Sequence, residues 1–189
     1  PVPAPAQAFG SGLEQGYSTT NIQVAGVDEA DVVKTDGTYI YVIAKNNVYI
    51  LKAYPPEEAA VLAKIVFNNT YLAGMFISQD GNKLAVLGSQ YDVYFYAGER
   101  SYIAEAYGYG YYSDNVKTFI NVYDISNKAN PVLARNFTMS GSYFNSRMIG
   151  NYVYAVVSQP AYLVNETVIL PTIYSGNNVK TIAASGIYY

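Results

Sequence analysis

The sequence has 189 residues and a formal net charge of −3, and only 13% of its residues are charged, against about 25% in ordinary soluble domains. It contains 22 tyrosines but no histidine and no cysteine. The absence of both residue types excludes Ser-His-Asp and cysteine-nucleophile catalysis, His- or Cys-ligated metal sites and disulfide bonds. An aromatic-rich composition with few charges favours β-strands, because aromatic side chains suit a pleated, half-buried surface.

Two further classes, nucleic-acid binding and membrane spanning, are not expected from this composition. No basic patch or stripe stands out, so we expect no nucleic-acid partner. No apolar run approaches the roughly 18–20 residues that a membrane-spanning helix needs, so we expect no transmembrane segment in this chain. Residues 1–20 are rich in proline, alanine and glycine, which predicts a tether ahead of the folded region.

The next feature is an acidic stretch that contains Asp28, Glu29 and Asp31. Carboxylates suit calcium, which takes about six to eight oxygen ligands, so these three residues are the candidate metal site and calcium is the candidate cofactor. Their spacing matches no recognised calcium loop, and in an extended strand Asp28 points away from the other two. The alternative is structural: the carboxylates cap turns and backbone amides, or pair with Lys34 or an arginine.

A turn followed by an alternating strand occurs three times, at residues 36–43, 80–87 and 149–156. Each copy has a glycine near its start, which can adopt the positive φ of a tight turn, and then the alternation of a sheet strand. The first two of these glycines are 44 residues apart, and the second and third are 69 residues apart. A Tyr/Gly-rich insertion at 91–115 accounts for the difference, so the sequence predicts a repeat.

Further strands are expected within each repeat. Residues 47–51 and 119–125 are predicted to form the next strands, and residues 61–64 and 132–135 share the pattern Val-Leu-Ala followed by Lys or Arg. About four short strands in a period of roughly 40–45 residues are typical of a β-propeller blade. An antiparallel sandwich with chance self-similarity is the alternative fold. The shared Val-Leu-Ala pattern at the same place in two units favours the propeller.

The sequence therefore predicts an all-β fold of about two and a half propeller blades, each of about four antiparallel strands. Within a folded region at 21–189, the expected boundaries are about 28–72 for blade 1, 73–141 for blade 2 with its insertion at 91–115, and 142–189 for the start of blade 3. Closed propellers need about 4–8 blades, and open sheet edges promote aggregation. We expect the remaining blades to come from the same longer polypeptide or from an assembling chain.

The Tyr/Gly-rich insertion is the candidate contact surface. Tyrosine offers a large amphipathic contact at low entropic cost, and glycine lets the backbone adapt, which suits a surface protein or a glycan as partner. The alternative is a long hairpin, with strands at 91–96 and 102–107, that packs on the neighbouring blades. The candidate contact residues are Tyr107, Tyr109, Tyr111 and Tyr112.

Three Asn-x-Ser/Thr sequons begin at Asn68, Asn136 and Asn165. Each is a candidate glycosylation site in a secreted chain. Three such triplets in a chain with no cysteine and few charges favour an exported protein, located outside the cell or at the cell surface.

Three motifs carry a family resemblance. Residues 19–37 resemble the opening signature of the secreted β-propeller domain proteins of archaea and bacteria, and the likeness returns at 122–126 with 130–133 and within 146–154. It covers roughly residues 17–158. The resemblance implies export, attachment at or release from the cell surface, and a propeller larger than this chain. It implies no catalytic residues.

The predicted function is therefore a non-catalytic extracellular or cell-surface β-propeller that acts as a structural or interaction module in adhesion or assembly. The alternative is an exported hydrolase whose active site is completed by blades absent from this chain. Such an enzyme would need a pair of carboxylates about 5–9.5 Å apart. Candidates within the insertion are Asp92, Glu99, Glu105 and Asp114.

Overall fold

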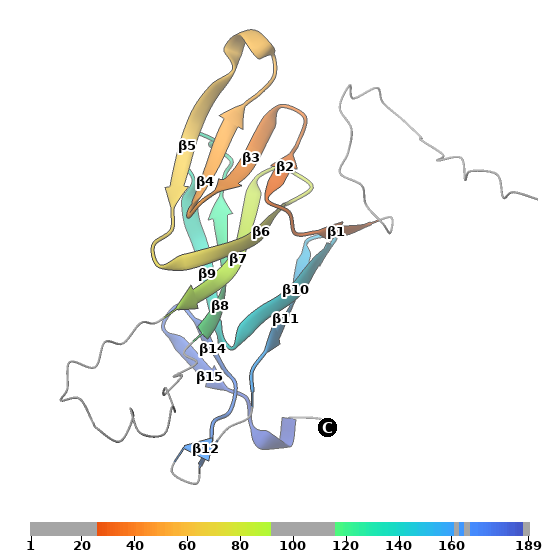
Figure 1. Ribbon diagram of the computed structural model, residues 1–189. Coiled ribbons are helices and arrows are strands. Elements are labelled where there is room, and N and C mark those ends of the chain that lie inside the picture. The colour runs from red at the N-terminus through yellow and green to blue at the C-terminus, as the bar shows by residue number, and fades with distance from the viewer. Residues whose placement is uncertain (1–25, 92–115, 161–162, 165–166, 187–189) are drawn as a thin grey trace, which may run out of the picture.

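The computed structural model describes residues 26–91, 116–160, 163–164 and 167–186. Within these ranges the chain forms antiparallel sheets and two short 3-10 helices, η1 (Pro56–Glu58) and η2 (Ala184–Gly186). The all-β fold with antiparallel blades is confirmed (Figure 1). In the part of the chain that the structure describes, no helix is long and apolar enough to cross a membrane.

Blade 1 is a four-stranded antiparallel sheet whose strands follow one another in sequence order. Its outermost strand contains the Val-Leu-Ala pattern, and η1 lies in the turn before that strand. The four strands are β2 (Val33–Thr35), β3 (Tyr39–Ala44), β4 (Asn47–Lys52) and β5 (Ala60–Val66).

Blade 2 has the same four-strand order and gains a hairpin on its outer edge. The hairpin pairs Ile173 with Met139 and thereby covers an edge that would otherwise be free. The sequence assigned these residues to the start of blade 3 and predicted no hairpin there, whereas the structure places them beside blade 2. The strands are β6 (Thr70–Ile77), β7 (Lys83–Tyr91), β8 (Val116–Asp124) and β9 (Val132–Ser140), followed by β14 (Thr172–Ser175) and β15 (Asn178–Thr181).

Blade 3 is represented by two consecutive strands and by one strand from much earlier in the chain. Figure 1 shows this early strand, β1, beside β10. The sequence assigned residues from 28 onward to blade 1, but Asp28 is the register partner of Met148. The sheet contains β1 (Val27–Glu29), β10 (Ser142–Ile149) and β11 (Tyr152–Ser158), and a separate small hairpin contains β12 (Leu163–Val164) and β13 (Thr167–Val168).

The predicted turns are present at the start of each unit. Gly37, Gly81 and Gly150 have φ values of 93°, 69° and 58°. These are left-handed conformations that favour glycine. Residues at the same distance after each of these glycines therefore occupy equivalent positions in the three blades.

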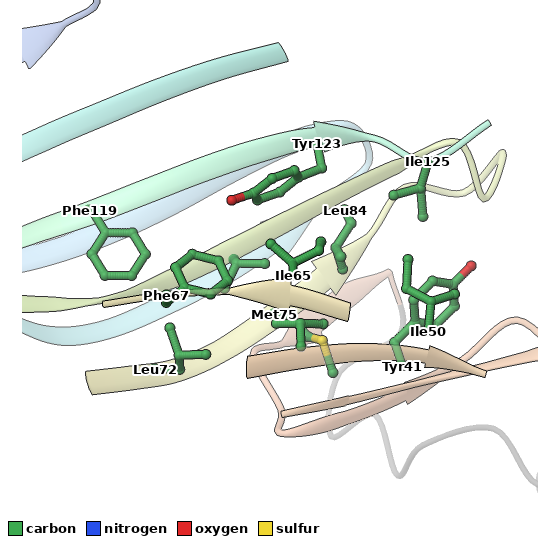
Figure 2. Packing of buried hydrophobic residues seen from close by; sticks show 12 residues of the cluster. Tyr41, Ile50, Ile65, Phe67, Leu72, Met75, Leu84, Phe119, Tyr123 and Ile125 are labelled. Atoms are coloured by element: carbon green, nitrogen blue, oxygen red, sulfur yellow. The ribbon is translucent and has the colours of Figure 1, made fainter. Parts of the chain in front are cut away.

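Two hydrophobic clusters lie between successive blades. Along β7, Leu84 and Val86 belong to the cluster shared with blade 1, whereas Ala85 and Leu87 belong to the cluster shared with blade 3. This alternation is that of a strand buried on both faces. Figure 2 shows the first cluster, whose buried members are Tyr41, Val48, Ile50, Ile65, Phe67, Leu72, Met75, Leu84, Val86, Phe119, Tyr123 and Ile125.

A close approach of strands in blade 2 requires glycine at position 88. A Cβ atom there would lie 2.1 Å from the carbonyl oxygen of Tyr71 and 2.9 Å from Cζ of Phe119. Because the first neighbour is backbone, we expect Gly88→Ala to destabilise the chain by about 3 kcal/mol or more. Urea denaturation measures this loss. Gly186→Ala is the matched control, since its nearest neighbour is Cγ2 of Ile182 at 3.8 Å, and an equal loss in both variants would contradict the steric account.

Candidate functional site

A single stretch at 27–35, here called the crosspiece, connects all three blades. Its start, β1, pairs with β10 of blade 3. Asp31 forms an isolated bridge with Met75 of blade 2, with N–O distances of 3.0 and 3.4 Å. Its end, β2, is the first strand of blade 1. The acidic stretch therefore links the three blades, and its start pairs with a strand far away in the sequence.

The carboxylates of the crosspiece have separate partners. Lys34 donates from Nζ to Oδ1 of Asp28 and to the carbonyl oxygen of Glu29, both at 2.6 Å. The Glu29 carboxylate pairs with Nη2 of Arg147 at 2.9 Å, and Oδ1 of Asp31 accepts from a backbone amide at 2.6 Å. Since each carboxylate is engaged elsewhere, the structure does not bring the three together.

These contacts correspond to the structural alternative rather than to the candidate calcium site. In the described ranges, no group of three or more acidic side chains is placed to hold a metal ion. The sequence named Lys34 as a partner but did not identify Arg147. Lys34 is register partner of Tyr41, and Arg147 is register partner of Tyr154, so both cations occupy equivalent positions on the first strands of their blades.

The face of blade 3 that carries Tyr154 and Val156 is apolar and exposed, and is here called the open face. Tyr154, four residues after the turn glycine, is 56% exposed, whereas its equivalent Tyr41 in blade 1 is fully buried. Val156 is 57% exposed, whereas its equivalent Leu87 in blade 2 is fully buried. In blades 1 and 2 these positions pack against the next blade. The open face therefore has the pattern of a blade interface.

A cavity of about 430 Å³ lies between blades 2 and 3. Its apolar wall comes from β6, β7, β8, β10 and β11, and its polar rim comes from the turns that precede β7 and β11. The sequence did not reveal this cavity, although its patterns predicted the strands and turns that surround it. The lining residues are Phe76, Ser78, Gln79, Asp80, Lys83, Ala85, Val122, Met148, Asn151 and Val153.

Comparison with known proteins agrees with the blade arrangement. The sequence matches the family described as Beta propeller domain over residues 17–189. The chain belongs to this beta propeller domain family. No solved structure matches it.

Two archaeal proteins resemble the chain in sequence. An uncharacterized protein of Methanocaldococcus jannaschii is 30% identical over 141 residues, which cover 75% of this chain. An uncharacterized protein of Archaeoglobus fulgidus is 26% identical over 187 residues, which cover 92% of this chain. The matched regions span only 17% and 24% of the lengths of these two relatives.

Two of the three sequons lie at exposed positions of the propeller blades. Asn68 is exposed in the turn between β5 and β6, and Asn136 is exposed on β9. Asn165 lies outside the described residues. Glycosylation at all three asparagines stays a prediction.

The Tyr/Gly-rich insertion interrupts blade 2 between β7 and β8. Tyr91 is the register partner of Val116, so the insertion leaves and rejoins the sheet at one place. The candidate contact residues Tyr107, Tyr109, Tyr111 and Tyr112, and the carboxylates considered for a hydrolase, lie outside the described residues. The contact surface and the catalytic alternative therefore stay predictions.

We expect an ion pair beside the cavity to make stability depend on pH. Hydrogen bonds from Lys83 and then from Ser126 lower the pKa of Asp124. Because the unfolded carboxyl has a pKa of about 3.9, the stabilisation is present above about pH 4 and is lost as the pH falls through the folded-state pKa. We expect the melting temperature of the wild type to fall more steeply between about pH 5 and pH 2 than that of Asp124→Asn. Parallel curves from circular dichroism would contradict this assignment.

Proposed function

We propose that the three blades are part of a larger propeller that acts outside the cell as a non-catalytic interaction module. The observation that carries the proposal is the open face of blade 3. Tyr154 and Val156 are exposed at positions where Tyr41 and Leu87 are fully buried. Exposed apolar sheet faces of this kind mark surfaces that bind another element. The occupant we propose is a further blade of the same longer polypeptide or of an assembling chain.

The proposed location outside the cell is supported by the composition of the sequence and by the exposure of two sequon asparagines. The chain has no histidine and no cysteine, and its charge is low. Asn68 and Asn136 are both exposed, as glycan acceptors must be. A surface rich in tyrosine suits contact with a surface protein or a glycan.

Protease shaving of intact source cells tests the location. We expect peptides of this chain in the supernatant before lysis, and a glycan mass on the peptides that contain Asn68 or Asn136. A cytoplasmic marker protein controls for leakage. Recovery of the peptides only after lysis would overturn the extracellular assignment.

Deleting residues 98–112 tests the interaction role. If tyrosines of the insertion form a contact surface, the deletion variant keeps its melting temperature within about 2 °C but loses binding to the source-cell surface, since β7 and β8 pair directly with each other up to Tyr91 and Val116. The control is an insertion of equal length in which the tyrosines are replaced by serine. Retained cell binding in both variants would contradict the contact role.

A further inference from the structure

The sequon at Asn68 contains a hydroxyl that the packing of the folded chain does not explain. Oγ1 of Thr70 is buried and, among the described residues, has no hydrogen-bond partner. A buried hydroxyl without a partner lowers stability, and such groups are rare in folded proteins. Thr70 begins β6 as the register partner of Gln90, and this strand position needs only the branched shape that valine also supplies. The fold would therefore be served as well without the hydroxyl.

The same hydroxyl belongs to a sequon whose asparagine is exposed. Asn68 lies in the turn between β5 and β6, where the next residue, Asn69, has a φ of 53°. Asparagine is among the residues that tolerate this left-handed conformation, so the turn accounts for Asn69. A transferase that selects Asn-x-Ser/Thr must contact the hydroxyl of the third residue. In the folded chain that hydroxyl is buried, so the transferase cannot reach it.

The sequon at Asn136 is closed by folding in another way. Its third residue, Thr138, lies on β9 between Phe119 of β8 and Tyr174 of β14. Neighbouring strands therefore occupy both sides of this backbone segment, and the segment cannot enter an enzyme's active site without leaving the sheet. Because β14 follows β9 in the sequence, the sequon is accessible on a growing chain before the β14–β15 hairpin is made. Both described sequons are thus accessible to a transferase before folding.

We propose that Asn68 is glycosylated before blades 1 and 2 fold, and that the Thr70 hydroxyl serves the transferase rather than the fold, an inference that rests on the proposed extracellular function. In the transfer, Nδ2 of Asn68 forms a bond to the anomeric carbon of a sugar carried on a lipid phosphate. The bond from that carbon to the phosphate oxygen breaks, the lipid phosphate leaves, and the proton lost by the amide passes through a base of the transferase to the solvent. Folding then buries the Thr70 hydroxyl and leaves the glycan in solvent.

A single-subunit oligosaccharyltransferase that reads Asn-x-Ser/Thr, supplied with its lipid-linked glycan, tests the order of the two events. The acceptors are the folded 189-residue chain and a peptide of residues 64–73, which is too short to fold alone. Mass spectrometry of the Asn68 peptide should show transfer to the free peptide at least about tenfold faster, because the folded chain must first open locally. Equal rates would overturn the proposed order. No transfer to the peptide, while an unrelated sequon peptide is modified in parallel, would overturn Asn68 as an acceptor.

Two variants at position 70 separate recognition from packing. Thr70→Val should abolish transfer to the peptide and should raise the melting temperature of the unmodified chain by about 2–4 °C, because it removes an unpaired hydroxyl. Thr70→Ser keeps the hydroxyl and should retain transfer. A lower melting temperature in Thr70→Val would overturn the claim that the fold has no use for this hydroxyl.

The native polypeptide isolated from its source separates failure of this inference from failure of the proposed function. We expect a glycan mass on the peptide that contains Asn68. An unmodified Asn68 on a polypeptide that protease shaving releases from intact cells would overturn the inference alone. An unmodified Asn68 on a polypeptide recovered only after lysis would instead overturn the proposed location.

Discussion

Replacing Tyr41 with alanine is expected to destabilise the chain by about 3–5 kcal/mol, which is the usual cost of truncating a buried aromatic side chain. The Tyr41 ring is fully buried between blades 1 and 2, and its hydroxyl is bonded to Asp36. Burial and the neighbouring Asp36 carboxylate raise the pKa of Tyr41 far above its ordinary value, so the hydroxyl stays a donor. The free energy of unfolding in urea measures the loss.

The matched control is Tyr154→Ala, which changes the same repeat position in blade 3. Tyr154 is 56% exposed, so its truncation in the 189-residue chain is expected to cost less than about 1 kcal/mol. The two losses of unfolding free energy should differ because Tyr41 is covered by a neighbouring blade, whereas Tyr154 lies on the open face of blade 3. Similar losses in both would mean that Tyr154 is already covered in the isolated chain.

Replacing Lys34 with methionine is expected to destabilise the chain by about 2–3 kcal/mol. The side chain of Lys34 is 7% exposed and that of Asp28 is 24% exposed, so removing the cation leaves a largely buried carboxylate unpaired. Breaking a fully buried ion pair costs about 3–5 kcal/mol, and the partial exposure of Asp28 reduces this figure. A double-mutant cycle with Asp28→Asn, followed by urea denaturation, isolates the coupling between the two side chains.

Arg147→Met is the matched control for the crosspiece, because Arg147 pairs with the adjacent carboxylate of Glu29. This pair is 38% and 41% exposed, and exposed ion pairs contribute about 0–1 kcal/mol. We therefore expect a small loss in Arg147→Met and a large one in Lys34→Met. Equal losses would contradict the view that burial of the Asp28 pair stabilises the crosspiece.

The features that the sequence predicted well depend on local patterns. Each turn glycine is followed by alternating apolar residues, and in the structure Gly37, Gly81 and Gly150 have positive φ. The Val-Leu-Ala segments lie on β5 and β9, the fourth strands of blades 1 and 2. Turn chemistry and alternation act between near neighbours, so a single sequence displays them.

The features that the sequence did not predict depend on pairing between distant segments. The pairing of Asp28 with Met148 joins residues far apart in the chain, and no local pattern specifies which open edge a three-residue strand will join. The β14–β15 hairpin joined the edge of β9 for the same reason. The sequence did contain one indication of the cavity, because the small residue Ala85 follows its turn glycine at the same distance as the large residue Tyr41. This difference indicates a cavity only once both positions are known to face the next blade.

Hydroxyl-radical footprinting of the native polypeptide isolated from its source, compared with the 189-residue chain, tests most directly whether a further blade completes the ring. In the isolated chain, Tyr152 and Tyr154 should be oxidised rapidly and Tyr41 slowly, in line with their exposure. If a further blade covers blade 3, oxidation of Tyr154 in the native polypeptide falls to the rate of Tyr41. Equally rapid oxidation of Tyr154 in both samples would contradict the claim that this face is a blade interface.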